Sequence, residues 1–253
     1  MSEVKKRLRI FAGPNGSGKS TLFNQFSKNY KTGYFINANL IEEHLKQKGF
    51  IDLEEYGISA SQVNFDSFMM QKNAKSLLQK AKQSRHEISL FLKDNFIVSS
   101  STDKFGYEGA LIASFLRERI MDTGKSFSFE TVMSHSSKLE EIKQAKEKGY
   151  LIYLYFICID DADINISRVE NRKQKGGHNV ETPKIIDRYT KTLKNLFPAI
   201  ELCDKGYLFD NSGKSLILIA DVIEQCLTLN MNEEKLPLWF KKYVLNHFTN
   251  ILD

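Results

Sequence analysis

The feature that most constrains this 253-residue chain is a glycine-rich stretch directly behind an apolar run. The run covers residues 8–11, and the stretch that follows reads Gly13-Pro14-Asn15-Gly16-Ser17-Gly18-Lys19-Ser20-Thr21. It matches the pattern G-x-x-x-x-G-K-[ST], in which glycines let the backbone turn tightly enough for successive N–H groups to point inward. Because an amphipathic segment begins at Leu22, the sequence predicts a strand, a phosphate-binding loop and a helix. We therefore expect a nucleoside triphosphate, ATP or another NTP, to bind here.

Three side chains of this loop have distinct expected roles. Lys19 is expected to reach the β- and γ-phosphates, and Ser20 is expected to place its hydroxyl on a Mg²⁺ ion. Thr21 adds a second hydroxyl at the start of the helix, whose N-terminus carries a partial positive charge. The predicted nucleotide site comprises Gly13, Pro14, Asn15, Gly16, Ser17, Gly18, Lys19, Ser20 and Thr21. The motif predicts binding, and by itself it does not specify a reaction.

Composition narrows the class of protein. A hydrophobic content of 42% over this length is enough for one α/β domain, or for a domain with an inserted helical piece. The net charge of +5 is mild and favours a phosphorylated ligand over a nucleic-acid surface. Three cysteines without a C-x-x-C pair argue against a metal knuckle or a redox dithiol and predict a reducing cytoplasm. The longest apolar run, residues 150–159, is too short to cross a bilayer.

Apolar segments alternate with helical patterns along the chain, which predicts an α/β fold. Strands are expected at 34–36, 126–130, 150–159 and 207–210, with one or two more within 216–229 and a final helix from Leu236. The segment 150–159 is apolar on both faces, as expected for a central parallel strand covered by helices on each side. We expect a three-layer α/β/α arrangement around a mostly parallel sheet.

Two regions depart from this alternation within what we read as a single domain of residues 1–253. Residues 52–103 show irregular helical spacing without a strand signal, and we interpret them as a helical insertion. Residues 162–190 predict two short helices around Gly176-Gly177, which is typical of a basic lid.

Five blocks, in this order, resemble the zeta-toxin-like family of P-loop kinases. They are residues 11–21, Ile36-Asn37-Ala38-Asn39, residues 127–131, Gly176-Gly177-His178-Asn179-Val180 and Asp210-Asn211-Ser212-Gly213. Best-known members are bacterial toxins that phosphorylate a hydroxyl of a UDP-linked amino sugar and are neutralised by a small helical antitoxin. The chain looks most similar to shorter chromosomal relatives, whose substrates are open. The resemblance implies an ATP- and Mg²⁺-dependent kinase acting on a phosphorylated metabolite such as a UDP-sugar, with an antitoxin as a candidate partner.

The resemblance also implies roles for charged residues outside the loop. Glu130, at the end of the third strand, would bind the substrate sugar or a metal-bound water; the alternative is a solvated acid at a strand end. Arg168 and Arg172 lie one helical turn apart and can face the transferring phosphoryl group together, with Arg188 as a third candidate. Each arginine can equally belong to a solvated helix face. His178 either contacts a phosphate or is an exposed histidine without a catalytic task.

One departure from the family concerns the second strand. The family usually has Asn-Ala-Asp there, and its aspartate accepts the proton of the substrate hydroxyl, whereas this chain has Asn37-Ala38-Asn39. Asn39 has no basicity near neutral pH. Three readings stay open: Glu42 or Glu43 takes the proton, the chain is a weak kinase, or it binds nucleotide without efficient transfer. In the last case it would be a switch or a partner sequestered by an antitoxin. A nucleic-acid end kinase is disfavoured, because aromatic and basic residues do not interleave along one element.

Overall fold

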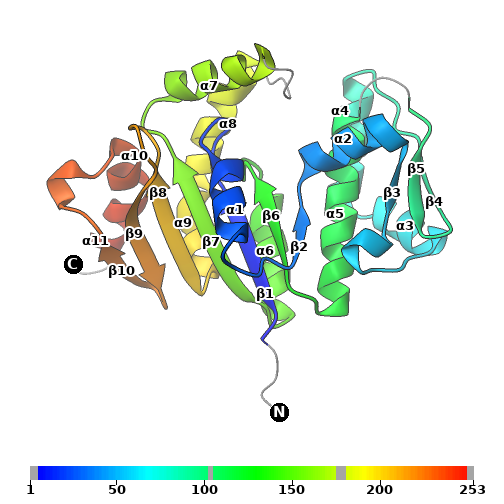
Figure 1. Cartoon of the computed structure of the whole chain (residues 1–253), viewed down its shortest axis with the longest axis horizontal. Coiled ribbons are helices and arrows are strands. Elements are labelled where there is room, and N and C mark those ends of the chain that lie inside the picture. The colour runs from blue at the N-terminus through cyan, green and yellow to red at the C-terminus, as the bar shows by residue number, and fades with distance from the viewer. Residues whose placement is uncertain (1–4, 102–104, 175–180, 250–253) are drawn as a thin grey trace. The chain divides into compact units, whose positions relative to one another are not determined.

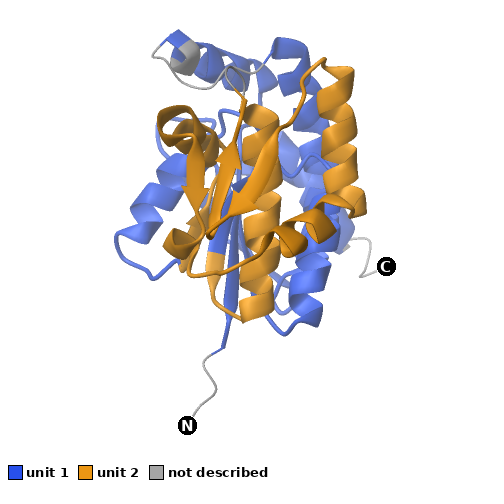
Figure 2. Cartoon of the chain, turned by 90° about the vertical axis from the view of Figure 1, so that its right-hand side faces the viewer, with its two compact units in different colours: residues 1–32, 128–253 blue, residues 33–127 orange. Residues whose placement is uncertain are grey.

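The structure is a computed structural model that describes residues 5–101, 105–174 and 181–249. The chain divides into two compact units, coloured separately in Figure 2. Unit 1 consists of residues 1–32 and 128–253, and unit 2 consists of residues 33–127. Unit 2 therefore interrupts unit 1 in the sequence, and the predicted insertion at 52–103 lies wholly within unit 2.

Unit 1 is built on a mostly parallel sheet. Its strands lie in the order β10-β9-β8-β7-β1-β6, with β7 parallel to both β1 and β8 and with β9 and β10 added antiparallel at the edge. Their bounds are β1 Arg7–Ala12, β6 Phe127–Thr131, β7 Leu151–Cys158, β8 Lys205–Asp210, β9 Ile217–Ile223 and β10 Cys226–Leu229. The expected one or two strands within 216–229 are two, joined at Glu224-Gln225, which both have positive φ.

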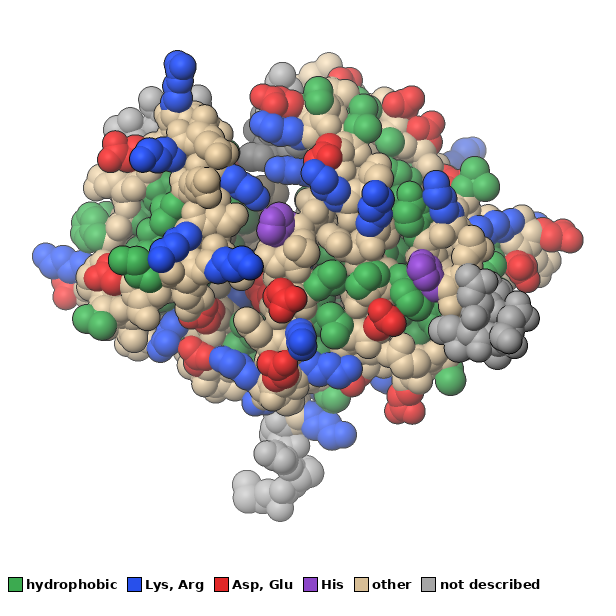
Figure 3. Space-filling model, turned by 180° about the vertical axis from the view of Figure 1, so that it is seen from behind, with side chains coloured by type: hydrophobic (Ala, Val, Ile, Leu, Met, Phe, Trp, Pro, Cys, Tyr) green, Lys and Arg blue, Asp and Glu red, His purple; other side chains and the backbone are tan. Residues whose placement is uncertain are grey.

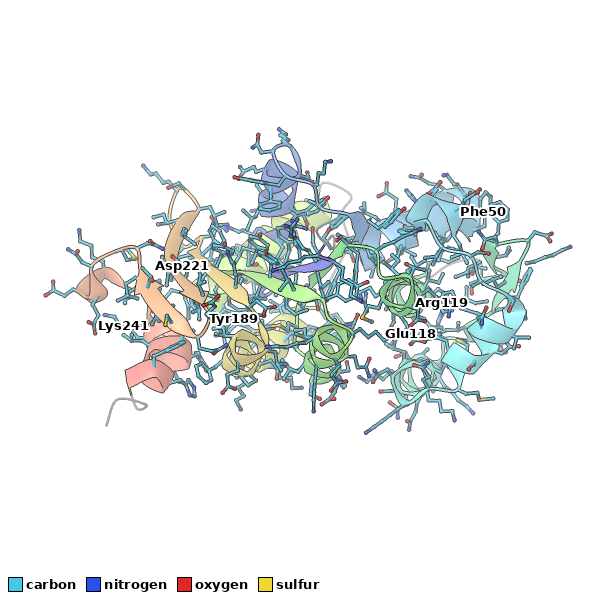
Figure 4. All side chains as sticks on the ribbon, turned by 90° about the horizontal axis from the view of Figure 1, so that it is seen from below. Phe50, Glu118, Arg119, Tyr189, Asp221 and Lys241 are labelled. Carbon is cyan, nitrogen blue, oxygen red and sulfur yellow. The ribbon has the colours of Figure 1, made fainter. Side chains whose placement is uncertain are left out.

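Helices cover both faces of this sheet, which confirms the predicted α/β class. Seen from below in Figure 4, α1 lies on one face of the sheet and α6 and α9 lie on the other. Figure 1 shows α7 beyond the carboxyl ends of β1 and β7. The helices are α1 Lys19–Ser27, α6 Ser137–Glu147, α7 Ala162–Gln174, α8 Thr182–Lys194, α9 Leu196–Leu202 and α10 Leu238–Phe240, with a π-helical turn, Lys241–Leu245, leading into α11 Asn246–Thr249. The arrangement is a three-layer α/β/α fold around a mostly parallel sheet, as the sequence predicts.

Aromatic side chains fix α1 on the centre of the sheet. Phe11 of β1 is paired in register with Tyr155 of β7, which is paired with Tyr207 of β8, and the three rings stack with centroid distances of 4.9 and 5.2 Å. Phe23 and Phe26 of α1 meet the Phe11 ring at 5.2 and 5.7 Å. Such pairs add about 0.5–1.5 kcal/mol each to the area they bury. The helix that follows the glycine-rich loop is thereby held against the strand that precedes it.

Unit 2 contains strands that the sequence did not predict. Residues 52–103 were expected to be helical throughout; they include α3 and α4, but also β4 and β5, which form a three-stranded antiparallel sheet with β3. Asp94 and Asn95 join β4 to β5 as a two-residue turn, and both have positive φ, as a type I′ hairpin turn requires. The elements are β2 Tyr34–Ile36, α2 Ala38–Lys48, β3 Phe50–Asp52, a 3₁₀ turn at Glu54–Tyr56, α3 Gln62–Met69, α4 Lys72–Gln83, β4 Leu90–Lys93, β5 Phe96–Ser99 and α5 Gly106–Thr123.

The strands of unit 2 escaped prediction because they are only three or four residues long and bury few side chains. In β4 and β5 the buried residues are Leu92 and Ile97, which face each other across the ladder. Among the described residues, no helix combines the length and the apolar character needed to cross a membrane.

Candidate functional site

The glycine-rich loop adopts a conformation that only glycine accommodates at three positions. Gly13, Gly16 and Gly18 have φ values of +145°, +77° and +105°. Gly18 directly precedes α1, so the loop ends at a helix N-terminus, where backbone N–H groups and the helix dipole favour an anion. The predicted strand, loop and helix are all found.

Three other elements of unit 1 hold the loop in place. A Cβ on Gly13 would overlap the carbonyl oxygen of Ile157 in β7, and one on Gly16 would stand 2.8 Å from the backbone oxygen of Asn165 in α7. Asn211, which follows β8, donates from Nδ2 to the carbonyl oxygen of Ser17 at 2.8 Å. The loop is therefore enclosed at the carboxyl ends of the strands, where open α/β sheets bind their ligands.

Lys19 is folded over the loop. Its ammonium Nζ donates to the carbonyl oxygens of Gly13 at 2.9 Å and Pro14 at 2.8 Å. These contacts keep a positive charge at the loop, where incoming phosphate oxygens can take over as acceptors. The role of Lys19 in nucleotide binding stays a prediction.

Ser20 and Glu130 lie together, although 110 positions separate them in the sequence. The Ser20 hydroxyl, in the first turn of α1, donates to Glu130 Oε2 at 2.9 Å. Glu130 comes from the carboxyl end of β6, so the sheet carries its carboxylate to the mouth of the loop. A hydroxyl and a carboxylate are the oxygen ligands that Mg²⁺ prefers, and in nucleotide sites the phosphates and water supply the others. Among the described residues, no group of three or more Asp, Glu, His or Cys could hold a metal without such help.

The three predicted arginines are distributed over α7 and α8. Arg168 is half-buried, and its Nη2 donates to the carbonyl oxygen of Asn211 at 3.1 Å, which places it beside the residue that holds Ser17. Arg172 lies one turn further along α7, but its side chain lies outside the described residues. Arg188 is a half-buried residue of α8. Gly176, Gly177 and His178 also lie outside the described residues, so the lid hinge stays a prediction.

The second helix of the predicted lid is tied to the sheet from Tyr189 onward. The hydroxyl of Tyr189, labelled in Figure 4, donates to the carbonyl oxygens of Ile159 at 2.7 Å and Asp160 at 3.2 Å. Burial raises the pKa of this hydroxyl above its usual value. Thr192 and Asn195 donate to the carbonyl oxygens of Val132 and Met133, both at 2.8 Å. The carboxyl-terminal part of α8 thus belongs to the folded frame of the site.

Asn39 and its neighbouring carboxylates belong to α2 in unit 2. Asn37 caps this helix, because its Oδ1 accepts from the backbone N–H of Asn39 at 2.9 Å, while the Asn39 side chain is exposed. Glu42 is 8% exposed and its Oε1 lies 2.6 Å from the ammonium of Lys46. Glu43 is exposed and accepts from Gln47 at 3.2 Å. Both alternative bases therefore have partners within α2, and Glu42 has a charged one.

Sequence reasoning missed the support that the end of β8 gives to the loop. Asn211 was part of the family resemblance but had no assigned role, since an asparagine after a strand usually indicates only a turn. The neighbouring Asp210 accepts from Trp239 Nε1 at 3.0 Å and from Ser212 at 2.8 Å. Trp239 is 2% exposed, so it packs in the core. Trp239 of α10 is thereby connected, through Asp210, to the segment whose Asn211 contacts the phosphate loop.

The surface shown in Figure 3 carries both signs of charge. Lysine and arginine side chains are interspersed there with aspartate and glutamate, and no large area of a single sign stands out. A groove that binds nucleic acid would require a continuous basic stripe.

Comparisons with known proteins support the fold. No family model matches the chain. An uncharacterized protein of Haemophilus influenzae is 33% identical over 63 residues, which are 25% of this chain and 45% of that protein. The chain therefore spans less than half of that relative.

Among solved structures, the complex AvrRxo1-ORF1:AvrRxo1-ORF2 with sulphate ions matches with a TM-score of 0.58 at 15% identity, covering 94% of this chain and 63% of the matched chain. The same complex with ATP matches with a TM-score of 0.55. A match to the PezAT chromosomal toxin-antitoxin system of Streptococcus pneumoniae, at 11% identity, covers 86% of this chain and 72% of that one. Its TM-score of 0.46 is too low to indicate a common fold by itself. The first two matches agree with the α/β fold predicted from the sequence.

Proposed function

We propose that this chain is a zeta-toxin-like kinase, which transfers the γ-phosphoryl group of ATP to a hydroxyl of a small phosphorylated metabolite, with a UDP-sugar as the acceptor. The hydrogen bond between Ser20 and Glu130 carries this proposal. A nucleoside triphosphate binds as its Mg²⁺ complex, and Ser20 with Glu130 would supply the hydroxyl and carboxylate oxygens for the ion that phosphoryl transfer requires. A carboxylate there adds negative charge beside the phosphates, which is tolerable when a cation offsets it.

The residues divide the work of phosphoryl transfer between binding and charge stabilisation. The loop and Lys19 would hold the triphosphate, while Ser20 and Glu130 would hold Mg²⁺, which supplies positive charge between the β- and γ-phosphates. Arg168, with Arg172 and Arg188, would offset the charge on the equatorial oxygens of the transferred group. In the reaction the acceptor oxygen bonds to the γ-phosphorus, the bond to the β-phosphate oxygen breaks, and the hydroxyl proton leaves with a base or solvent.

Asn39 supports a second candidate function. Since an amide does not accept this proton and Glu42 is already paired with Lys46, the chain can instead be a nucleotide-binding protein with weakened transfer. Such a protein would act as a switch or as the sequestered partner of an antitoxin. Base catalysis is a secondary contribution in a loose transition state, so the kinase proposal does not depend on it.

The test compares transfer and binding in matched variants. Purified protein is incubated with ATP, Mg²⁺ and a panel of UDP-sugars, and phosphorylated product is measured by mass spectrometry and ATP binding by calorimetry. We expect Lys19→Ala to lose both ATP binding and phosphoryl transfer. Glu130→Gln should keep ATP binding but lose at least about tenfold in transfer. Lys28→Ala changes an exposed residue at the end of α1 and should match wild type in both measurements. If wild type and Lys19→Ala are equally inactive while wild type binds ATP, the second function holds.

Asn39→Asp distinguishes a missing base from a relocated one. A gain in turnover of about 100-fold or more would mean that the native chain lacks a base. No gain, combined with a loss in Glu42→Gln or Glu43→Gln, would mean that one of those carboxylates has taken over the proton.

A protein partner and a reducing compartment complete the proposal. AvrRxo1-ORF1 was solved in complex with AvrRxo1-ORF2, and we extend this to an antitoxin-like partner for the present chain. All three cysteines are free thiols, with Cys158 and Cys203 buried and Cys226 exposed, which suits the cytoplasm. Copurification from the native cell would identify such a partner.

A further inference from the structure

The residue of α7 whose backbone lies against the phosphate loop, Asn165, carries a buried side-chain amide without hydrogen-bond partners among the described residues. Asn165 in α7 has an exposed fraction of 0%, and neither its Nδ2 nor its Oδ1 has a hydrogen-bond partner among the described residues. An enclosed amide without partners destabilises a fold, and such groups in native proteins are rare. A residue that destabilises the protein in this way calls for a functional reason.

The surroundings of Asn165 point to the loop. A Cβ added to Gly16 would stand 2.8 Å from the Asn165 backbone oxygen, 3.4 Å from its Cα and 3.4 Å from Cγ2 of Val169. Asn165 and Val169 are four positions apart, so they share the face of α7 that packs on the loop. Gly16 leaves no space for any side chain between the loop and this face.

Two more polar groups in the same corner lack partners. The Ser17 hydroxyl is fully buried, and neither it nor Asn15 Oδ1 has a hydrogen-bond partner in the described part of the chain. Asn15 and Ser17 flank Gly16 in the sequence, and Gly16 is the loop residue that lies against the Asn165 backbone.

We propose that Asn165 is a positioning residue that couples the filling of the phosphate loop to the placement of α7. When the triphosphate draws the loop onto itself, the Asn165 amide gains hydrogen bonds with the loop at Asn15–Ser17. These bonds hold α7, and with it Arg168 one turn further along, toward the transferred phosphoryl group. The inference rests on the proposed function, because it requires that the loop bind a nucleotide.

The test uses Asn165→Leu, which keeps the volume of the side chain and removes both polar atoms. Melting temperature is measured without nucleotide and with ATP and Mg²⁺, and the ATP dissociation constant is measured by calorimetry. We expect the variant to melt about 3 °C or more above wild type without nucleotide, because the unbonded amide is gone. We expect its ATP dissociation constant to rise by about tenfold or more, because hydrogen bonds made only in the bound state are lost.

Val222→Ala is the matched control, since it removes buried methyl groups from β9 without touching the loop, α7 or a polar group. It should melt below wild type and bind ATP with an unchanged dissociation constant. If Asn165→Leu does not fold, Asn165→Ala is read for the same rise in dissociation constant.

The outcomes separate this inference from the proposed function. Wild type that fails to bind ATP overturns both. Wild type that binds ATP, together with an Asn165 variant of equal affinity or of lower melting temperature without nucleotide, overturns the role of Asn165 alone.

Discussion

Gly13→Ala is the sharpest test of how the phosphate loop is built, because one added methyl group meets two separate obstacles. The φ of +145° is a backbone conformation that residues with a side chain rarely adopt, at a cost of about 1–3 kcal/mol. The new Cβ would also overlap the carbonyl oxygen of Ile157 and lie 3.1 Å from its carbonyl carbon. Both atoms belong to the backbone of a central strand, so no flexible side chain can move aside. Overpacking of this kind costs about 1–3 kcal/mol more.

Together these effects predict a loss of about 3 kcal/mol or more in unfolding free energy, which lowers the melting temperature by about 6–12 °C in a chain of this size. The assay is thermal unfolding followed by circular dichroism. Gly149→Ala is the control for strain alone, since Gly149 has a φ of +78° and a Cβ there would meet only Lys6 Cε at 3.6 Å, an ordinary contact. Gly213→Ala is the control for open space, because nothing lies within 4 Å of its added Cβ.

We expect Gly149→Ala to cost about 1 kcal/mol and Gly213→Ala to stay within about 0.5 kcal/mol of wild type. All three positions lie in unit 1, so the same unfolding transition reports on each. The reasoning is refuted if Gly13→Ala melts within about 2 °C of Gly149→Ala, a margin of about 1 kcal/mol, since the backbone overlap would then carry no cost.

Three further outcomes are expected. Glu108 is fully buried, and its Oε1 accepts from His86 at 2.7 Å and from Ser101 at 2.8 Å. His86→Leu leaves this buried carboxylate without its histidine partner, so it should lower the free energy of unfolding in urea by about 3 kcal/mol. Adding Glu108→Gln should recover part of that loss. A thiol reagent should label one cysteine per folded chain, the exposed Cys226, and labelling of all three before unfolding would contradict the burial that raises the pKa of Cys158 and Cys203. Burial raises the pKa of Tyr155 from 10.0 to about 12, so its contribution to stability is complete below pH 10 and is lost as the pH rises through 12. The melting temperature of a Tyr155→Phe variant should therefore fall less steeply than that of wild type between pH 10 and 12. An unchanged slope would contradict the role of Tyr155.

The sequence alone determined the features that depend on short stretches of chain. The nine residues from Gly13 to Thr21 specify the loop because each glycine meets a local backbone requirement, and the apolar segment at 150–159 specifies a buried strand because both of its faces are apolar. Periodicity failed in residues 52–103, where β4 and β5 are short and a two-residue turn at Asp94-Asn95 decides the hairpin. The tertiary fold outweighs propensity in elements of this length.

Only the tertiary structure decided which distant residues meet at the loop. The hydrogen bond between Ser20 and Glu130, the support of Ser17 by Asn211 and the contact of Asn165 with Gly16 join residues that are separated by 110, 194 and 149 positions. Parallel strands bring their carboxyl ends to one edge of the sheet, whatever their distance along the chain. The sequence could therefore name Lys19, Ser20 and Glu130, whereas the unmet hydrogen bonds of Asn165 depend on what encloses the amide, which is a property of the fold and of no local pattern.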